Sequence, residues 1–554
     1  MSIVLGIHDG HNASAALIAD GEVVAAVAEE RVTRRKNSSG FPHGAIAAVL
    51  DLGAIDACDL DAVALASEWQ NRPEWFDAQG TMKAGPYEAR ADRADAEARQ
   101  RRLGLYRTER MERASHLLGG RHGTTLFRID HHSAHAAAAF YSSPHRDDDV
   151  AVVTMDGSGD GLCATVSVSD GGKLRRIRSS PATASWGKIV ARTTALLGFR
   201  PWEHEYKLMG LAPYVDQDRC GDAYEVLAPM VWLDGLEFRT HLPFGTSYAW
   251  PHLAAGLEGI RFDHVAAALQ LRTEQLVVEF VAAAAKAVGT RTVCLGGGVA
   301  MNVKANQLAT ARLDHLYVCP SAGDESLAIG AAYLAAVDLG DTPEPLGAPY
   351  LGRYTGPTAK VADEARRKGF RVEQVDDPNQ ALLERLLGGE IVGRCTGRAE
   401  WGARALGHRS VLMDAARADL VPRLNDAIKH RDFWMPFAPS MTATAAAELL
   451  HRPGGSTDDG WMMVAADTTP RGRELLAAAI HPRDGSARPQ VVDARHDVHL
   501  DLVTRFESCT GRPLLNTSLN IHGDPMVDSA ADAFDVLVRS KLDAMVIDDV
   551  VITR

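Results

Sequence analysis

The chain has 554 residues, several times the length of a typical domain, so we expect roughly two to four domains and a core that needs no disulfide support. Hydrophobic residues make up 46% and charged residues 24% of the chain, the proportions of a folded enzyme rather than of a disordered chain. The 59 Lys and Arg against 72 Asp and Glu leave a formal net charge of −13, which argues against a broad surface for nucleic acid or an anionic membrane.

The cysteines and the N-terminus indicate the compartment. The seven cysteines are scattered and include no C-x-x-C pair, which is typical of reduced thiols. The N-terminal apolar run ends at His8 and Asp9, so no export signal is predicted. The longest Ala/Val-rich stretch, residues 276–288, contains Glu279 and Lys286 and is too short for a bilayer span. We therefore expect a cytoplasmic protein.

Short apolar runs separated by polar turns predict a β-meander at the N-terminus. The runs cover residues 3–7, 13–19 and 23–28, and Asp20-Gly21 between the last two is a strong hairpin signal. Residues 150–155 and 162–168 flank a turn rich in Gly and Asp at 156–161 and repeat this plan. Two copies of one plan indicate a duplicated fold.

The rest of the chain predicts helices, a strand and a second domain. Residues 87–118 are rich in Arg, Glu, Asp and Ala and predict a solvated helix, which could also serve as a substrate lid. Residues 265–288 predict a long amphipathic helix, followed by a strand at 292–295. The Pro/Gly-rich stretch 342–357 predicts an interdomain connection. We place the first domain at 1–347, a linker at 348–358 and a second α/β domain at 359–554.

A histidine pair is the first candidate for chemistry. His131 and His135 lie four residues apart in a helix-forming stretch, so their imidazoles share one face. Such a pair can chelate zinc or ferrous iron, and Asp156 and Asp324 are plausible carboxylate partners. The alternative is that these histidines cap or pack the helix, and His132 fits a structural or second-layer role.

Glycine turns are the second candidate. No P-loop motif occurs, but backbone amides in glycine turns can approach a phosphate closely. The turns include Gly157, the pair Gly297-Gly298 followed by Asn302, and Gly323-Asp324. Each could instead be an ordinary turn. Three of them in one domain with a duplicated meander point to the fold shared by actin, sugar kinases and heat-shock ATPases.

Basic residues concentrate in the second domain. In an acidic protein this cation density predicts a pocket for a small anion, because guanidinium and ammonium groups recognise phosphate and carboxylate oxygens. Ordinary surface arginines with carboxylate partners are the alternative. The candidates are Arg398, Arg404, Arg409 with Ser410, Lys429, Arg431 and Arg488, together with the polar stretch 516–520.

Eight motifs are spread over almost the whole chain, at residues 10–17, 29–36, 131–135, 205–214, 295–302, 402–410, 436–439 and 516–520. Through these motifs the chain resembles the O-carbamoyltransferases of the nodulation and antibiotic-tailoring class. The resemblance implies an N-terminal Kae-like domain of actin-like (ASKHA) fold and a C-terminal YrdC-like α/β domain.

The resemblance also implies a division of chemistry between these domains. The YrdC-like domain would bind ATP with Mg²⁺ and carbamoyl phosphate, and would release phosphate and pyrophosphate to form carbamoyl-adenylate. The residues matched to this site are Lys429, Arg431, Ser518 and Asn520, with Arg404, Arg409, Ser410 and Arg488 around them. The Kae-like domain would hold the intermediate on Gly157, Gly297, Gly298 and Asn302.

In the Kae-like domain the resemblance implies a divalent metal on His131, His135, Asp156 and Asp324, with iron first and zinc or manganese as alternatives. His11 matches a histidine beside the acceptor hydroxyl, where an imidazole suits a general base. Lys36 matches a lysine of the acceptor or carbamoyl pocket. Asn12 stands where relatives usually carry Asp, which puts the strength of the base in question.

Two other functions are compatible with these domains. A tRNA-threonylcarbamoylating enzyme uses the same domain types. The negative net charge and the absence of a basic arm in the sequence argue against a tRNA-binding surface. A non-catalytic nucleotide-binding regulator could keep the glycine turns. The acceptor is expected to be a hydroxyl-bearing small molecule, on whose sugar faces Trp69, Trp75, Tyr248 and Trp250 could stack if they are not core residues. A two-fold homodimer is the common oligomer for such a protein.

Overall fold

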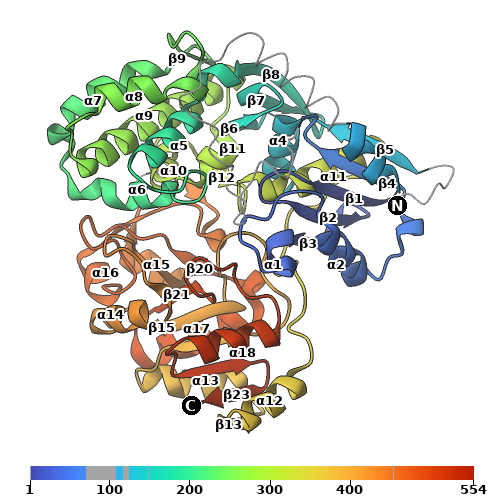
Figure 1. The fold of residues 1–554 in the computed structure, drawn as a ribbon, viewed down its shortest axis with the longest axis vertical. Coiled ribbons are helices and arrows are strands. Elements are labelled where there is room, and N and C mark those ends of the chain that lie inside the picture. The colour runs from blue at the N-terminus through green and yellow to red at the C-terminus, as the bar shows by residue number, and fades with distance from the viewer. Residues whose placement is uncertain (1, 70–107, 117–123, 147–148, 453) are drawn as a thin grey trace. The chain divides into compact units, whose positions relative to one another are not determined.

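The structure is a computed structural model that describes residues 2–69, 108–116, 124–146, 149–452 and 454–554 (Figure 1). The chain forms two compact units. Unit 1 comprises Met1–Glu29, Asn37–Leu346 and Pro453–Asp458, and unit 2 comprises Glu30–Lys36, Gly347–Arg452 and Asp459–Arg554. Two short segments, residues 30–36 and 453–458, therefore belong to a different unit from their neighbours in the chain. Of the helix predicted over 87–118, residues 108–116 are helical, and the remainder lies outside the described residues, as does Trp75.

The first sheet of unit 1 has five strands in the order β3-β2-β1-β4-β5. They are β1 (Ile3–His8), β2 (Ser14–Ala19), β3 (Glu22–Ala28), β4 (Ala62–Ala66) and β5 (Thr125–Ile129). Neighbours among β1, β2 and β3 are antiparallel, β4 runs parallel to β1, and β5 runs parallel to β4. The predicted meander is confirmed, with Asp20-Gly21 as the left-handed two-residue turn between β2 and β3.

The second sheet of unit 1 has six strands in the order β18-β12-β11-β6-β7-β8. They are β6 (Ala151–Gly159), β7 (Leu162–Asp170), β8 (Lys173–Pro181), β11 (Thr292–Gly296), β12 (His315–Val318) and β18 (Ser456–Thr457). Neighbours among β6, β7 and β8 are antiparallel, β11 is parallel to β6, and β12 is parallel to β11. The order and directions of the strands from β8 to β12 therefore repeat those from β3 to β5.

The glycine-rich turn predicted over 156–161 is shorter than expected. β6 continues to Gly159 with an irregular register after Met155, and the turn itself is Asp160-Gly161. A bulged strand leaves residues unpaired and re-aims their side chains. Asp156 therefore lies on an irregular strand end rather than at the tip of a turn.

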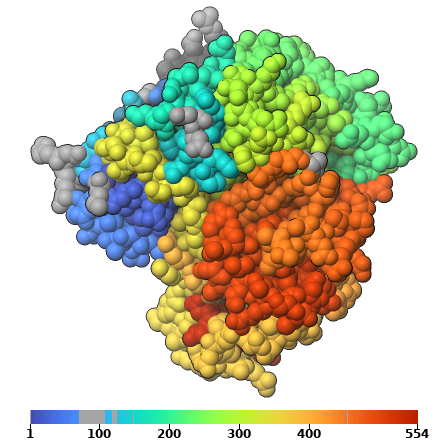
Figure 2. All heavy atoms as spheres, turned by 180° about the vertical axis from the view of Figure 1, so that it is seen from behind, coloured from blue at the N-terminus to red at the C-terminus, as the bar shows by residue number. Residues whose placement is uncertain are grey.

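Two helices bring the sheets of unit 1 together around the candidate metal ligands. α4 (His131–Tyr141) packs on β6 and β11, and α11 (Leu327–Leu339) packs on β1 and on α4. A side chain at Gly330 of α11 would meet the carbonyl oxygen of Ala134 in α4 at 1.8 Å, so only glycine allows this close approach. The chain around α11 (yellow) lies beside the blue N-terminal segment in both views (Figures 1 and 2).

The long amphipathic helix predicted over 265–288 is confirmed as α9 (Phe262–Val288). Among the described helices, none combines the length and the apolar character that a bilayer span requires. The other elements of unit 1 include α2 (His43–Gly53), α5 (Trp186–Leu196), α6 (Glu205–Leu211), α7 (Gly221–Leu227), α8 (Trp250–Gly256), α10 (Val303–Thr310), β9 (Trp232–Asp234), β10 (Glu237–Arg239) and the short 3₁₀ turns η8 (Gly298–Met301) and η9 (Asp324–Ser326).

Unit 2 is built on an eight-stranded mixed sheet in the order β13-β23-β22-β14-β15-β21-β16-β20. Its strands are β13 (Arg371–Gln374), β14 (Val392–Cys395), β15 (Arg409–Asp414), β16 (Ala438–Thr442), β20 (Gln490–Val492), β21 (Leu514–Ser518), β22 (Ala544–Ile547) and β23 (Val550–Thr553). Its helices are α12 (Thr358–Arg367), α13 (Pro378–Leu387), α14 (Val421–Leu424), α15 (Ala443–Leu449), α16 (Pro470–Leu475), α17 (Asp497–Thr510) and α18 (Ala530–Arg539), with the short pair β17 (Leu450–His451) and β19 (Asp467–Thr468) beside them. α1 (Glu29–Thr33) leads into the exchanged segment 30–36.

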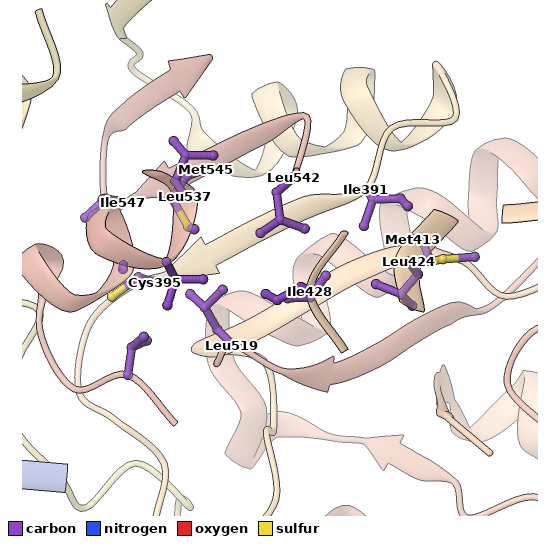
Figure 3. Packing of buried hydrophobic residues seen from close by; sticks show 14 of the residues in the cluster. Ile391, Cys395, Met413, Leu424, Ile428, Leu519, Leu537, Leu542, Met545 and Ile547 are labelled. Atoms are coloured by element: carbon purple, nitrogen blue, oxygen red, sulfur yellow. The ribbon is translucent and has the colours of Figure 1, made fainter. Parts of the chain in front are cut away.

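Both faces of this sheet are buried. Successive residues of β22 alternate between two hydrophobic clusters, with Met545 and Ile547 in one and Ala544 and Val546 in the other. Figure 3 shows the first cluster, in which Met545 lies near Leu537. A period of two with both faces apolar is typical of a sheet covered by helices on each side. The predicted α/β class is confirmed for both units.

Candidate active site

α4 presents the two candidate histidine ligands. The helix begins at His131 because the Asp130 carboxylate accepts the N–H of Ser133 at 2.8 Å and caps the N-terminus. One helical turn separates His131 from His135, and their ring centroids lie 4.7 Å apart. Both side chains are buried. The predicted shared face is confirmed.

Two carboxylates complete the cluster. The Nε2 atom of His131 lies 3.4 Å from Oδ2 of Asp156 and 3.8 Å from Oδ1 of Asp324. The Nε2 atom of His135 lies 3.5 Å from the same oxygen of Asp324. Asp156 comes from the irregular end of β6, and Asp324 opens η9 just before α11. The sequence-predicted ligands therefore converge, with one ligand atom from each residue within 4.8 Å of the others.

The donor set fits a divalent cation. Neither Nε2 atom has a hydrogen-bond partner among the described residues, although both are buried. Burial by itself lowers the pKa of His131, but the carboxylates of Asp156 and Asp324 raise it to about 9. The histidines in turn hold the pKa of Asp156 below its usual range. Two imidazoles and two carboxylates suit zinc, iron or manganese, and a bound cation would satisfy all four groups.

A second layer of residues orients the ligands. Ser67 Oγ lies 2.9 Å from Nδ1 of His131, a contact that turns Nε2 toward the carboxylates. His132 contacts the hydroxyl of Thr154 at 2.8 Å, and burial lowers its pKa to about 3, so it is a neutral, structural residue as predicted. A Cβ at Gly159 would lie 2.0 Å from the His131 ring. No sequence motif pointed to Ser67.

The predicted glycine turns surround Asp156. The backbone N–H of Gly298 donates to Oδ1 of Asp156 at 2.9 Å, and Gly297 turns the chain with a φ of 91°. A side chain at Gly157 would meet no neighbour within 4 Å, so one side of the backbone there has space for a ligand. Asn302 is already engaged, because its carbonyl oxygen caps α10 and its amide donates to Gln270 at 2.8 Å. Asn302 therefore shapes this turn, and a contact of its second amide N–H with a nucleotide stays a prediction.

His11 lies in the turn between β1 and β2. Nε2 of the buried His8 lies 2.9 Å from the carbonyl oxygen of His11, and burial lowers the pKa of His8 to about 4. Asn12 has a φ of 57°, a left-handed conformation that Asn tolerates better than most residues. The neighbouring Asp9 carboxylate accepts two bonds of 2.6 Å from the buried Arg110 guanidinium. Arg110, which no motif indicated, thus ties residues 108–116 to this turn.

Unit 2 holds the predicted cations close together. The Nζ atom of the buried Lys429 donates to Oδ1 of Asn520 at 2.9 Å and to Oγ of Ser518 at 3.2 Å. Burial lowers the pKa of Lys429, and Arg431 and Lys36 lower it further. Burial also lowers the pKa of Arg488, with Arg404 and Arg431 adding to the effect. Within the described residues, no carboxylate forms an ion pair with Lys429 or Arg488, so the cluster favours an anionic ligand.

One predicted ligand of this site, Arg409, serves the scaffold instead. The guanidinium of Arg409 is fully buried and donates to backbone carbonyl oxygens. These include the carbonyl of Thr396 and, at 3.0 Å, the carbonyl of Asp528. Ser410 Oγ accepts the N–H of Gly407 at 3.0 Å. A guanidinium whose donors are used by carbonyl groups has none left for a phosphate. Arg409 therefore holds the strand that supports the site, and a contact of Ser410 with a ligand stays a prediction.

Lys36 also lies in unit 2, whereas the resemblance implies a place for it in the N-terminal domain. Arg31 donates to the carbonyl oxygen of Gly402 at 2.7 Å, and Arg34 donates to that of Met526 at 2.6 Å. These bonds fasten the segment 30–36 to unit 2. The partly buried Lys36 lies within electrostatic reach of Lys429, since it lowers the pKa of that ammonium.

Two comparisons identify the family. The family model "Carbamoyltransferase N-terminus" matches residues 3–333, and "Carbamoyltransferase C-terminus" matches residues 383–554. Nodulation protein NolNO of Sinorhizobium fredii is 29% identical, covering 98% of this chain and 79% of that protein. Nodulation protein NolO of Bradyrhizobium diazoefficiens is 31% identical, covering 76% of this chain and 78% of that protein.

Among solved structures, full-length HypF in its phosphate- and nucleotide-bound form matches with a TM-score of 0.35 and 13% identity, covering 62% of this chain and 47% of that one. The two family models together match well over half of the residues. The protein is therefore an enzyme that transfers a carbamoyl group from a donor to an acceptor, and the chain belongs to the carbamoyltransferase family.

Proposed function

We propose that the protein is an ATP-dependent O-carbamoyltransferase that makes carbamoyl-adenylate in unit 2 and passes the carbamoyl group to a hydroxyl of a small molecule in unit 1. The observation that carries this proposal is the opposite character of the two clusters. Unit 1 contains buried carboxylates and imidazoles that suit a cation, whereas unit 2 contains buried cations without carboxylate partners among the described residues. Two clusters of opposite charge are suited to two different steps.

The same proposal assigns the folds. The repeated strand order in unit 1 supports a duplicated actin-like architecture, since each half has a three-stranded meander followed by two parallel strands. The mixed sheet of unit 2, with the cation cluster near the end of β21, supports a YrdC-like domain. In this reading the first domain spans residues 1–347 and the second spans 359–554, with the segments 30–36 and 453–458 exchanged.

In unit 2 the cations would bind the phosphates of both substrates. Lys429 is held by Ser518 and Asn520, so its charge is positioned without being neutralised by a carboxylate among the described residues. Arg431 and Arg488 add guanidinium donors that match phosphate oxygens. Water takes the phosphoryl group of carbamoyl phosphate and leaves as inorganic phosphate, and an oxygen of the remaining carbamate attacks the α-phosphorus of ATP. The bond to pyrophosphate breaks, and carbamoyl-adenylate forms.

In unit 1 the acceptor oxygen attacks the carbamoyl carbon while the bond between that carbon and the adenylate oxygen breaks. His11 takes the proton of the acceptor hydroxyl, and AMP leaves with the bonding electrons. The open backbone at Gly157 and the N–H groups of the glycine turn would hold the adenylate. A divalent metal on His131, His135, Asp156 and Asp324, when bound, would supply positive charge beside the oxygens of the intermediate.

The test separates the two steps with one variant in each unit. Lys429→Met should reduce carbamoyl phosphate-dependent pyrophosphate release about a hundredfold, because it removes a preorganised charge from the first step. Asp156→Asn should keep pyrophosphate release and lose both bound metal and carbamoylated acceptor, detected by mass in a pool of hydroxyl-bearing compounds. Lys541→Met and Asp314→Asn are matched controls, because these residues form exposed ion pairs in the same units.

The outcomes distinguish the proposal from its alternatives. Pyrophosphate release that survives Lys429→Met would remove unit 2 from the first step. If Asp156→Asn abolished pyrophosphate release as fully as Lys429→Met, the division of labour would be wrong. Consumption of neither ATP nor carbamoyl phosphate by the unchanged, metal-supplied protein would refute the ATP-dependent reaction.

A further inference from the structure

A tryptophan that the sequence motifs passed over lies beside His11. Trp202 is in the connection between α5 and α6, and its indole packs against the His11 imidazole with ring centroids 6.1 Å apart and an angle of 60° between the planes. Trp202 is partly exposed. The indole therefore flanks the proposed general base without enclosing it.

The backbone of Trp202 is held in an unusual conformation. Its φ is 64°, in the left-handed region that a bulky side chain rarely adopts and that costs on the order of 1 kcal/mol. Its N–H donates to Oε1 of Glu205, the first residue of α6, at a distance of 2.5 Å. Two further hydrogen bonds stabilise the same connection. The N–H of His204 donates to the carbonyl oxygen of Arg200 at 2.9 Å, and the Arg200 guanidinium donates to the Glu203 carboxylate at 2.8 Å. Local bonds thus fix where the indole points.

This tryptophan does not have the surroundings of a core residue. Trp186 in the same unit is 2% exposed, and its indole N–H donates to the hydroxyl of Thr273 at 2.8 Å. Trp202 keeps solvent exposure, and its indole N–H has no hydrogen-bond partner among the described residues. A strained backbone that holds an aromatic ring partly exposed beside a reactive group is explained by a ligand that uses the ring.

We propose that Trp202 binds the acceptor, stacking its indole on the carbon-bound hydrogens of a saturated, hydroxyl-bearing ring such as a sugar or cyclitol and directing one hydroxyl toward His11. This inference rests on the proposed function and adds to it a residue that binds the acceptor. The indole supplies an apolar face for the ring and one N–H donor for a hydroxyl, a combination that suits an amphipathic, polyhydroxylated ring. The glutamate at position 205 is a positioning residue, because it acts through the backbone of Trp202.

The test removes the indole without straining the fold. Trp202→Gly deletes the ring and places at this φ the residue that tolerates it best, whereas Trp202→Phe keeps an apolar face and loses the N–H donor. Trp232→Ala is the matched control, because Trp232 is 40% exposed and stacks on His241 at 6.4 Å elsewhere in unit 1. The probes are N-acetylglucosamine oligomers, myo-inositol and uridine.

Two readouts keep the inference separate from the proposed function. Saturation-transfer NMR measures probe binding, and carbamoyl phosphate-dependent pyrophosphate release measures the first step without an acceptor. We expect Trp202→Gly to weaken probe binding, and the acceptor KM where a product forms, about tenfold or more, equivalent to about 1.4 kcal/mol. Trp202→Phe should lose about threefold, the Trp232 variant should be unchanged, and all three should release pyrophosphate normally.

A folded Trp202→Gly protein that binds the probes as tightly as the unchanged protein would overturn the inference. So would a loss of AMP binding, with saccharide binding intact, because the indole would then serve the adenine ring. If the unchanged protein releases no pyrophosphate but binds a saccharide through Trp202, the proposed reaction fails while the binding inference stands.

Discussion

The Glu205 carboxyl is a source of pH-dependent instability. Burial, with a smaller contribution from the nearby Glu203, raises the pKa of Glu205 from 4.5 to about 7. A carboxyl with a higher pKa in the folded state binds its proton more tightly there, so the free energy of unfolding falls as the pH rises from about 4.5 to 7. The difference between 4.5 and about 7 corresponds to about 3 kcal/mol, all of which is lost above pH 7.

Glu205→Gln removes this ionisation and keeps an oxygen for the Trp202 N–H. Because Gln is neutral at every pH, the stability of the variant relative to the unchanged protein should increase by about 2 kcal/mol between pH 5 and pH 8. Guanidinium denaturation at several pH values measures this difference, and any constant cost of burying the amide cancels. Glu203→Gln removes the ion pair with Arg200 and the 3.8 Å contact with His204 but keeps the buried carboxyl of Glu205, so it should show a smaller trend.

The reasoning about Glu205 would be refuted by a relative stability that is the same at pH 5 and pH 8, or that falls with rising pH. Either result would mean that the carboxylate is ionised and well solvated or hydrogen-bonded in the folded protein. Position 205 also reports on Trp202. Glu205→Gln should retain saccharide binding, whereas a further variant, Glu205→Ala, should weaken it.

Three further predictions concern single contacts. Arg110→Met leaves the Asp9 carboxylate buried without its partner and should lower the free energy of unfolding by about 3–5 kcal/mol, measured by thermal unfolding. Adding Asp9→Asn should recover part of that loss. An unchanged melting temperature would show that the pair is solvated. Gly159→Ala forces a methyl group into a histidine ligand and should lower bound metal measured by elemental analysis, whereas Gly157→Ala should not. Lys36→Met should reduce the rate of carbamoyl phosphate-dependent pyrophosphate release about tenfold. If the variant lost only the transfer to the acceptor, Lys36 would act in the step assigned to unit 1.

Local patterns predicted much of unit 1. The meander of β1 to β3 follows from alternating apolar runs and from Asp20-Gly21, and the face shared by His131 and His135 follows from helical spacing. These features depend on residues only a few positions apart. Asp156 and Asp324 are far apart in the sequence and meet only in the folded chain. Residue spacing could not predict that contact, so the prediction depended on the resemblance and on the glycine turns.

The exchanged segments show what local patterns miss. Arg31 and Arg34 stand in a basic run that follows directly on β3, yet their guanidinium groups bond to carbonyls of unit 2 and take Lys36 with them. Arg409 shows the reverse error, since an arginine in a basic stretch that predicted a phosphate ligand has its donors used by backbone carbonyls. The number of donors that remain free is a property of the folded chain and not of the residue type.

The backbone around the candidate site adds a further argument. Asn12, Ser67, Asp160 and Trp202 all have positive φ values, although none is glycine. Each is next to the site: Asn12 follows His11, Ser67 contacts His131, the Asp160 carboxylate accepts the N–H of His131 at 2.8 Å, and Trp202 packs on His11. Glycine would remove the strain at each position, but it would also remove the side chain. The residues kept there therefore serve the site through contacts that offset their backbone cost.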